Sequence, residues 1–385
     1  MARTAEVVII GGGIHGCSIA YHLAKCGVKN VLVVEKGFLA SGGTGRSAAG
    51  FRHQFGTEVN IRLAAASIKK LERLAEELDY PYGIELFQGG YLMLAYSASQ
   101  LEQLRKNASL QNRLVNAGTL ILSPREIAEL LPGLNLEGVV GGSFNPRDGH
   151  ANPFHVTYAY ARAARRLGVE IQTYTEVVEI LHSTSRVLGV RTSRGEVIYA
   201  PVVVNAAGPH GGVVARMVGV DVPLYPERHQ ILVTEPVEMF IPCMVISFTH
   251  GTYFKQTPHG SILMGVGDPA GEVKDFNQRS SWQFLVDVAT KMTFHLPALR
   301  RARVIRQWAG LYDMTPDSQA ILGPVPGLDG FYLDIGWSGH GFQLGPIVGQ
   351  IMAEMITGQE PAVDVSYFSI ERFKTGQLIP EPACV

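Results

Sequence analysis

The stretch that decides the fold is Glu6–Gly16, which reads EVVIIGGGIHG. The apolar run Val7–Ile10 is typical of a buried parallel strand, and the glycines follow that strand directly. Gly11 allows a tight turn, Gly13 lets a pyrophosphate approach the backbone, and Gly16 lets a helix pack close to the sheet. The stretch therefore predicts the first strand, turn and helix of a dinucleotide-binding unit.

A second apolar run, Val31–Val34, ends on Glu35. A carboxylate at this distance from the glycines can accept hydrogen bonds from ribose hydroxyls. It also argues against a 2′-phosphate, so FAD or NAD is favoured over NADP. Because glycines, strand, helix, strand and acid occur in order, a purely structural glycine-rich turn is the weaker interpretation.

Composition excludes several classes of function. Lys and Arg number 33 and Asp and Glu 34, so the net charge of −1 favours neither nucleic acid nor an anionic membrane. The apolar runs are strand-sized, and no transmembrane helix or signal peptide is expected. The cysteines Cys17, Cys26, Cys243 and Cys384 show no metal or redox spacing, so we expect no metal and a reduced, cytoplasmic setting.

Strands of the nucleotide-binding type return twice later in the chain, at Val202–Gly208 and Phe331–Gly336. Such a discontinuous cofactor domain is more typical of flavoproteins than of nicotinamide dehydrogenases. The periodicity predicts helices over Glu58–Leu78, Ser99–Ala117, Pro124–Leu131 and Phe154–Leu167, and another beginning near Pro346.

Five further segments are similar to motifs of a known protein family: Ser41–Gly50 (SGGTGRSAAG), Asp148–Pro153 (DGHANP), Asn205–Gly208 (NAAG), Thr315–Asp317 (TPD) and Gly336–Phe342 (GWSGHGF). With the N-terminal unit, they make the chain resemble the D-amino-acid oxidase superfamily of FAD enzymes. The chain looks most like the β subunits of dye-linked L-proline dehydrogenase and heterotetrameric sarcosine oxidase.

The resemblance implies an α/β protein in which a discontinuous Rossmann-like FAD-binding domain carries an inserted α+β substrate domain on a mixed, largely antiparallel sheet. We expect residues 1–85, 146–220 and 320–385 in the FAD-binding domain. Residues 86–145 and 221–319 are expected to form the substrate domain.

The cofactor contacts are expected in the glycine turn, in the polar loop 41–50, which can wrap the pyrophosphate and flavin edge, and in the later motifs. The resemblance adds backbone contacts to adenine near Val177 and a helix N-terminus facing the flavin N1/C2 side. The expected set is Gly11, Gly13, Ile14, His15, Gly16, Glu35, Lys36, Ser41, Gly43, Thr44, Arg46, Ser47, Ala48, Gly50, Val177, Ala206, Gly208, Leu311, Gly336, Gly339, His340, Gly341, Phe342 and Gln343.

Four residues are expected at the substrate. Arg52 matches a position that carries a carboxylate-binding arginine in monomeric sarcosine oxidase, and a guanidinium can bind a carboxylate bidentately. A surface ion pair is the alternative role for this arginine. His229 and Tyr253 match substrate-pocket positions of the proline dehydrogenase branch, although either could be an ordinary core residue. Gln343 stands where sarcosine oxidases have a lysine.

Three further departures from the family bear on chemistry. The cysteine that holds flavin covalently falls at Gly310, so FAD should be noncovalent. The histidine that anchors FMN in heterotetrameric sarcosine oxidase is replaced near Pro153, so an FMN at a subunit interface should also be noncovalent. The lysine credited with oxygen activation falls near Leu263, which favours a dehydrogenase over an oxidase.

The expected activity is FAD-dependent oxidation of a secondary amino acid, L-proline or sarcosine or another N-alkyl amino acid, by hydride transfer to flavin N5. An α subunit or another electron-accepting partner is expected from the resemblance. The alternatives are a glycine or D-amino-acid oxidase, a glycerol-3-phosphate dehydrogenase with more cationic phosphate ligands, and a non-catalytic FAD-binding subunit of an electron-transfer complex.

Overall fold

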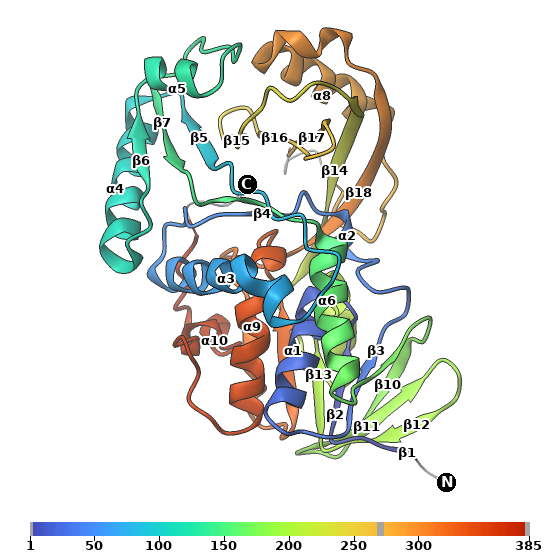
Figure 1. Cartoon of the computed structure of the whole chain (residues 1–385). Coiled ribbons are helices and arrows are strands. Elements are labelled where there is room, and N and C mark those ends of the chain that lie inside the picture. Colours follow the sequence, from blue (N-terminus) through green and yellow to red (C-terminus); the bar gives the residue numbers. More distant parts are fainter. Residues whose placement is uncertain (1–2, 268–272, 382–385) are drawn as a thin grey trace.

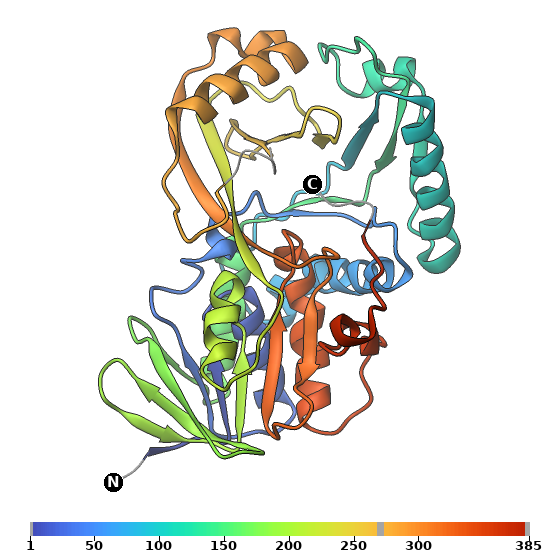
Figure 2. The same cartoon turned by 180° about the vertical axis from the view of Figure 1, so that it is seen from behind.

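The computed structural model describes residues 3–267 and 273–381 of the chain. The molecule has two lobes, one above the other in Figure 1, and the view from behind in Figure 2 shows the same division. The first described residues lie at the far end of the lower lobe, and the chain crosses between the lobes several times. Cys384 lies outside the described residues.

The lower lobe is built on a six-stranded sheet in the order β19-β20-β13-β2-β3-β9. Its strands are β2 (Val7–Ile10), β3 (Val31–Val34), β9 (Glu170–Gln172), β13 (Val202–Asn205), β19 (Ile321–Pro324) and β20 (Phe331–Ile335). All neighbours are parallel except β19, which runs antiparallel to β20. The four apolar runs that the sequence singled out, now β20, β13, β2 and β3, thus lie side by side.

Helices cover one face of this sheet (Figure 1). They are α1 (Ile14–Lys25), α3 (Glu58–Glu77), α6 (Pro153–Arg166) and α9 (Gly341–Ile356). Because side chains alternate along a strand, Val7 and Ile9 pack against helices, whereas Val8 and Ile10 face the opposite side. The uninterrupted apolar run follows from burial on both faces.

A four-stranded sheet covers that opposite face. Its order is β1-β12-β11-β10, from β1 (Arg3–Thr4), β10 (Val177–His182), β11 (Val187–Thr192) and β12 (Val197–Tyr199). The lower lobe therefore has three layers: helices, the parallel sheet and the smaller sheet.

The upper lobe contains an eight-stranded sheet in the order β18-β14-β17-β16-β15-β5-β7-β6. The strands are β5 (Tyr91–Ala95), β6 (Leu120–Leu122), β7 (Gly141–Asn145), β14 (Tyr225–Pro236), β15 (Met244–Ser247), β16 (Thr252–Gln256), β17 (Ser261–Val266) and β18 (Val304–Met314). Only the β15–β5 pair is parallel. Helices α5 (Pro124–Leu130) and α8 (Trp282–His295) pack on one face, and α4 (Ala98–Val115) contacts β5, β6 and β7.

Shorter elements complete the described chain. A two-stranded sheet joins β4 (Gly50–Phe51) to β8 (Gly149–His150). The remaining helices are α2 (Gly43–Arg46), α7 (Gly211–Arg216) and α10 (Arg372–Thr375), with 3-10 turns at Gly208–His210, Pro297–Arg301 and Ser366–Phe368.

The expected fold class is confirmed, including the mixed, largely antiparallel second sheet. The strands of the six-stranded sheet all fall in the segments expected to form the cofactor domain. Those of the eight-stranded sheet fall in the segments expected to form the substrate domain. The domain boundaries themselves stay a prediction.

The expected start of the last long helix is wrong. Helix α9 begins at Gly341, and Pro346 lies inside it. A proline there lacks the N–H that would bond the Phe342 carbonyl four residues earlier. Packing outweighs this loss, because Leu344, Ile347 and Val348 are almost fully buried against the core of the lower lobe.

Every helix among residues 3–267 and 273–381 is too short or too polar to span a bilayer.

Candidate functional site

The turn between β2 and α1 is packed so closely that only glycine fits at two of its positions. Gly11 has φ +117°, and a Cβ there would collide with the Ala206 carbonyl oxygen. A Cβ on Gly16 would collide with the Gly11 carbonyl oxygen. At Gly13, by contrast, the described residues place one neighbour near a Cβ, Thr44 Oγ1 at 3.1 Å, so the space before the helix is open.

Glu35 holds this turn from the end of β3. Its Oε2 accepts a hydrogen bond from the Gly12 amide at 2.7 Å, and its Oε1 accepts one from the Gly37 amide at 2.6 Å. The carboxylate is thus fixed beside the glycine turn, at the carboxyl end of a parallel strand. Its hydrogen bond to a ribose stays a prediction.

The loop 41–50 runs from the glycine turn to the boundary between the lobes. Arg46 fixes it, because Nε donates to the Ser41 carbonyl at 3.1 Å and Nη1 donates to the Ala309 carbonyl at 2.9 Å. The Trp308 indole donates in return to the Arg46 carbonyl at 2.9 Å. Arg46 therefore joins the loop to β18. Its expected contact with a cofactor stays a prediction.

The other expected cofactor residues lie around the carboxyl ends of the parallel strands, with three exceptions. The first two are Val177, which begins β10 with its side chain in the core, and Leu311, which is buried in β18; the third is Lys36, which follows the carboxyl end of β3 but is exposed to solvent. Ala206 and Gly208 follow β13, and Gly336 follows β20 and donates its amide to Asp313 at 2.7 Å. Ligands of parallel α/β sheets bind at this edge.

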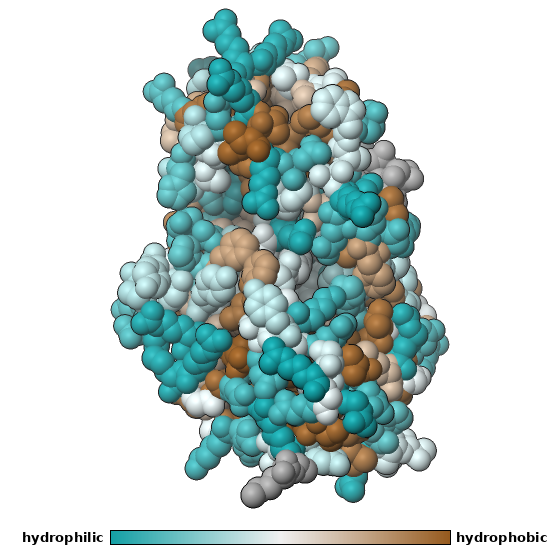
Figure 3. Space-filling view, turned by 90° about the vertical axis from the view of Figure 1, so that its right-hand side faces the viewer, coloured by the Kyte–Doolittle hydropathy of each residue, from teal (hydrophilic) through white to brown (hydrophobic). Residues whose placement is uncertain are grey.

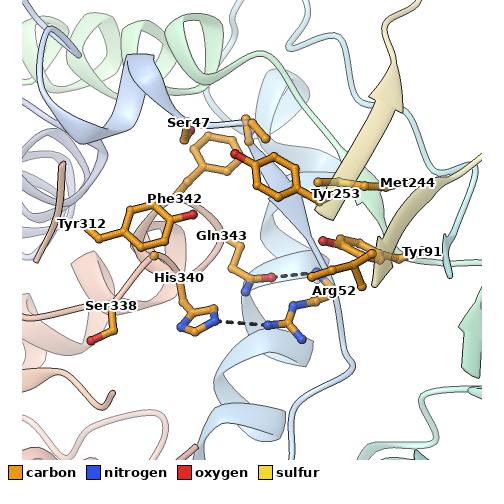
Figure 4. A pocket seen from close by; sticks show the side chains of 15 residues that line it. Ser47, Arg52, Tyr91, Met244, Tyr253, Tyr312, Ser338, His340, Phe342 and Gln343 are labelled. Atoms are coloured by element: carbon orange, nitrogen blue, oxygen red, sulfur yellow. Dashed lines mark hydrogen bonds between the residues drawn. The ribbon is translucent and has the colours of Figure 1, made fainter. Parts of the chain in front are cut away.

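A cavity lies where the loop 41–50 and the start of α9 meet the upper sheet (Figure 4). Expected site residues on its wall are Ser47, Ala48, Gly50, Arg52, Tyr253, Gly339, His340, Phe342 and Gln343. The structure adds Ala49, Tyr91, Met244, Ile246, Tyr312 and Ser338. The left-handed backbone of Ala49 (φ 52°) and Ser338 (φ 48°) is the kind of strain that concentrates at functional sites.

Arg52 is buried on this wall, which argues against a surface ion pair. Its Nη1 donates to the Gln54 carbonyl at 2.7 Å, and Nη2 donates to His340 Nε2 at 3.1 Å. Its guanidinium carbon lies 4.6 Å from the centre of the Phe55 ring. These contacts hold the fork of Arg52 in one place on the wall (Figure 4).

His340 and Gln343 belong to the same cluster. Burial and, secondly, the Arg52 guanidinium lower the pKa of His340 to about 3, so this ring is neutral and accepts the Arg52 hydrogen bond. Gln343 Oε1 accepts from the Arg52 backbone amide at 2.7 Å. The first turn of α9 thereby fixes both the backbone and the side chain of Arg52.

The opposite wall is aromatic and apolar. Burial raises the pKa of Tyr91 to about 12 and that of Tyr253 well above its usual value, so both phenols stay neutral. Gly265, opposite Tyr253 on β17, is needed because a Cβ there would collide with the Tyr253 ring. No sequence motif pointed to Tyr91 or Met244, because only the pairing of β5 with β15 brings them together.

The structure does not place His229 on the cavity wall. Its ring stacks on Tyr312 at 3.7 Å between centroids, and its Nε2 lies 3.1 Å from Glu227 Oε1. Tyr312 lines the cavity and His229 does not. A role for His229 in direct substrate contact is therefore not supported, and His229 supports Tyr312 instead.

A lysine lies next to Leu263, the position at which the sequence indicated no cation. Lys255 on β16 pairs with Leu263 on β17 and is buried. Burial lowers the pKa of Lys255 to about 7, and Glu85 opposes this shift. Lys255 is not among the residues that line the cavity.

Comparison with known proteins identifies the family. A family model described as FAD dependent oxidoreductase matches residues 6–355. The chain belongs to this family. The sarcosine oxidase subunit beta of Rhodobacter capsulatus is 32% identical to it, over 98% of this chain and 90% of that protein.

Two solved structures are similar to this chain in both sequence and fold. The L-proline dehydrogenase from P. horikoshii is 36% identical with a TM-score of 0.92, covering 98% of this chain and all (100%) of that one. The glycine oxidase from Geobacillus kaustophilus is 25% identical with a TM-score of 0.87, over 96% of this chain and 99% of that one.

The site fits FAD. The open face of Gly13 stands at the N-terminus of α1, whose positive dipole end suits a pyrophosphate, and Thr44 Oγ1 accepts a hydrogen bond from the first helical amide, that of Ile14, at 3.2 Å. Gly13, Glu35 and Thr44 would hold the dinucleotide end, and the loop 41–50 would lead to the flavin end at the cavity. Among the described residues, no group of three or more His, Cys, Asp or Glu could hold a metal ion.

We expect acid or heat precipitation to release the FAD without protease digestion. Gly310, opposite His229 on the paired strands β14 and β18, offers no thiol. The absorbance of the supernatant at flavin wavelengths measures the release. Yellow colour that stays with the washed pellet would contradict noncovalent binding.

Proposed function

We propose that this protein oxidises a secondary amino acid with FAD, proline first and sarcosine or another N-alkyl amino acid next. The observation that carries the proposal is the buried guanidinium of Arg52 on a cavity whose facing wall is apolar and aromatic. Such a cavity suits a ligand with one carboxylate and an apolar body. The chemistry that FAD supplies is hydride acceptance at N5, which turns the amine into an imine.

The residues of the chain have positioning roles in this proposal. Arg52 binds the substrate carboxylate, held by Gln343 and His340. Tyr91, Tyr253 and Met244 would pack against the apolar part of the substrate and exclude water. An amine that binds in its neutral form needs no strong base, so the absence of His229 from the wall does not count against the reaction.

Anaerobic bleaching tests the proposal. We expect the yellow protein to lose its flavin absorbance on mixing with L-proline or sarcosine, and not with D-alanine or glycine. Bleaching by glycine or D-amino acids alone would favour an oxidase of those substrates. A protein that is inert toward every amino acid would instead be a non-catalytic FAD-binding subunit.

A glycerol-3-phosphate dehydrogenase is the weakest alternative. A phosphate ester calls for several cationic ligands, and Arg52 is the one Lys or Arg among the residues that line the cavity. Glycerol 3-phosphate belongs in the same bleaching screen as a negative control.

We further propose that electrons pass to a partner, such as an α subunit with a noncovalent FMN at the interface, rather than to oxygen. The relation to a sarcosine oxidase β subunit supports this. Exposed apolar side chains offer contact surface: Val304 and Ile305 lie on β18, the outer strand of the upper sheet, and are 42% and 61% exposed. Figure 3 shows brown side chains among polar ones on the upper lobe.

Stopped-flow mixing of substrate-reduced protein with air-saturated buffer and with an artificial dye tests the acceptor. We expect slow reoxidation by oxygen and fast reoxidation by the dye, because Leu263 supplies no charge and burial keeps Lys255 only partly protonated near neutral pH. The Lys255→Met variant is the control. If oxygen reoxidises the wild type as fast as the dye does, and Lys255→Met abolishes this reaction with oxygen, the protein is an oxidase.

A further inference from the structure

His15 occupies a position between the two helices that point at the cofactor site. It lies in the first turn of α1 and is buried. Its Nε2 lies 2.8 Å from the Gly341 carbonyl oxygen in the first turn of α9. Its Nδ1 lies 3.0 Å from Asp334 Oδ2, at the end of β20. Both ring nitrogens therefore meet oxygens on other elements.

These partners decide the protonation of the ring. A backbone carbonyl only accepts hydrogen bonds, so Nε2 carries a proton. Asp334 also accepts from the Trp337 indole, whose Nε1 lies 2.7 Å from Oδ1. Asp334 Oδ2, at 3.0 Å, offers an acceptor to Nδ1 too, so we assign a proton to both ring nitrogens of His15. His15 is then an imidazolium paired with a buried carboxylate.

The electrostatic surroundings agree with this assignment. Burial by itself would lower the pKa of His15, but Asp334, the Gly341 carbonyl and the more distant Asp313 outweigh it and raise that pKa. Asp313 is held by the Gly336 amide at 2.7 Å, and burial raises its pKa. The charged groups that face His15 are thus both acidic, one from β20 and one from β18.

The ion pair also links the two halves of the cofactor site. The first turn of α1 follows Gly13, the open position before the helix, and the first turn of α9 carries Phe342 and Gln343 of the cavity wall. The His15 ring packs on Trp337 at 4.9 Å between centroids, and a Cβ on Gly341 would lie 3.3 Å from His15 Nε2.

We propose that His15 and Asp334 form a positioning pair that holds the N-termini of α1 and α9 together and presents its positive end to the bound FAD. An imidazolium at two helix N-termini is unfavourable unless an anion is near, and Asp334 supplies that anion in the protein alone. The FAD pyrophosphate adds a second one. Removal of His15 leaves the buried Asp334 carboxylate without its cation behind the two helix N-termini, whereas neutralisation of both partners leaves no net charge.

Three variants separate charge from packing. Asp334→Asn keeps an acceptor for Trp337 and a donor for a neutral His15, so it is the matched control. His15→Leu removes the cation alone, and His15→Leu combined with Asp334→Asn removes both charges. FAD affinity of the apoprotein, measured by flavin fluorescence quenching, and the flavin midpoint potential are the readouts, with thermal unfolding of the apoprotein as the check on folding.

We expect His15→Leu to weaken FAD binding at least tenfold and to lower the midpoint potential. Asp334→Asn should stay within about threefold of the wild type, and the double variant should regain most of the loss. If the double variant binds FAD as weakly as His15→Leu, or if Asp334→Asn is the more damaging single change, the pair acts through packing and the proposal is overturned.

A measurement that needs no His15 variant covers the case in which His15→Leu does not fold. In ¹⁵N-histidine-labelled holoprotein at pH 8, one ring is expected to show the imidazolium pattern and to become neutral in Asp334→Asn. No such ring in the wild type would overturn the assignment. Neither experiment involves substrate, so the outcome is independent of the proposed reaction.

Discussion

The Gly13→Val variant is expected to fold and to contain no FAD. The backbone of Gly13 (φ −78°) is one that valine adopts, and the described neighbour of a Cβ there is the Thr44 hydroxyl at 3.1 Å, a tight contact that a small shift of this side chain relieves. The added methyl groups, however, occupy the space through which a pyrophosphate would approach the helix amides. The loss is therefore expected in cofactor binding rather than in folding.

The flavin-to-protein absorbance ratio and the far-ultraviolet circular dichroism of the purified variant measure this effect. Ala98→Val is the matched control, because it adds the same two methyl groups to an exposed helix start, that of α4 in the other lobe. Stoichiometric FAD in a folded Gly13→Val protein would refute the phosphate assignment. The control should keep its full complement of FAD.

Much of the lower lobe could be predicted because its signals are local. Val7–Ile10, Val31–Val34 and Phe331–Ile335 are apolar runs that match strands buried on both faces. The glycine positions follow from backbone contacts within the turn or with the next strand. The resemblance then supplied the discontinuous arrangement of the cofactor domain, whereas the strand order is known only from the structure.

The start of α9 could not be predicted from local preference. Pro346 is favoured in a first helical turn, which led to a start five residues too late. The true start depends on tertiary contacts, since the Gly341 carbonyl meets His15 and the Gln343 carbonyl accepts from Ser67 at 2.5 Å. The same contacts explain why the His15–Asp334 pair was not anticipated.

The cavity wall was only half predictable, for a topological reason. The half from the lower lobe, including Arg52 and His340, lies in contiguous motifs. The other half comes from β5, β15 and β16. Of these strands, the resemblance suggested only Tyr253, because the parallel pairing that places Met244 beside Tyr91 joins segments distant in sequence. His229 was expected at the substrate because a histidine can accept a proton from an amine, but its ring stacks on Tyr312 and does not line the cavity.

Arg52→Met is expected to raise the KM for the amino-acid substrate about 30-fold to 1000-fold while FAD stays bound. This range corresponds to the roughly 2–4 kcal/mol lost when a charge-assisted contact is removed from a buried site. Arg52→Lys should also raise KM, by less, because a lysine keeps the charge but not the planar fork. The kcat should fall less than KM rises if the guanidinium binds the carboxylate alike in the ground and transition states.

Two comparisons separate substrate binding from structural damage in this variant. Arg62→Met is the matched control, since Arg62 lies on the exposed face of α3 and pairs only with Glu58 among the ion pairs of the described chain, at 2.7 Å. It should leave KM unchanged. Because Arg52 also donates to His340 and to Gln54, the flavin spectrum of Arg52→Met must match the wild type before its KM is interpreted. An unchanged KM with an unchanged spectrum would place the substrate carboxylate elsewhere, and Arg52 would then be a buried support for the first turn of α9.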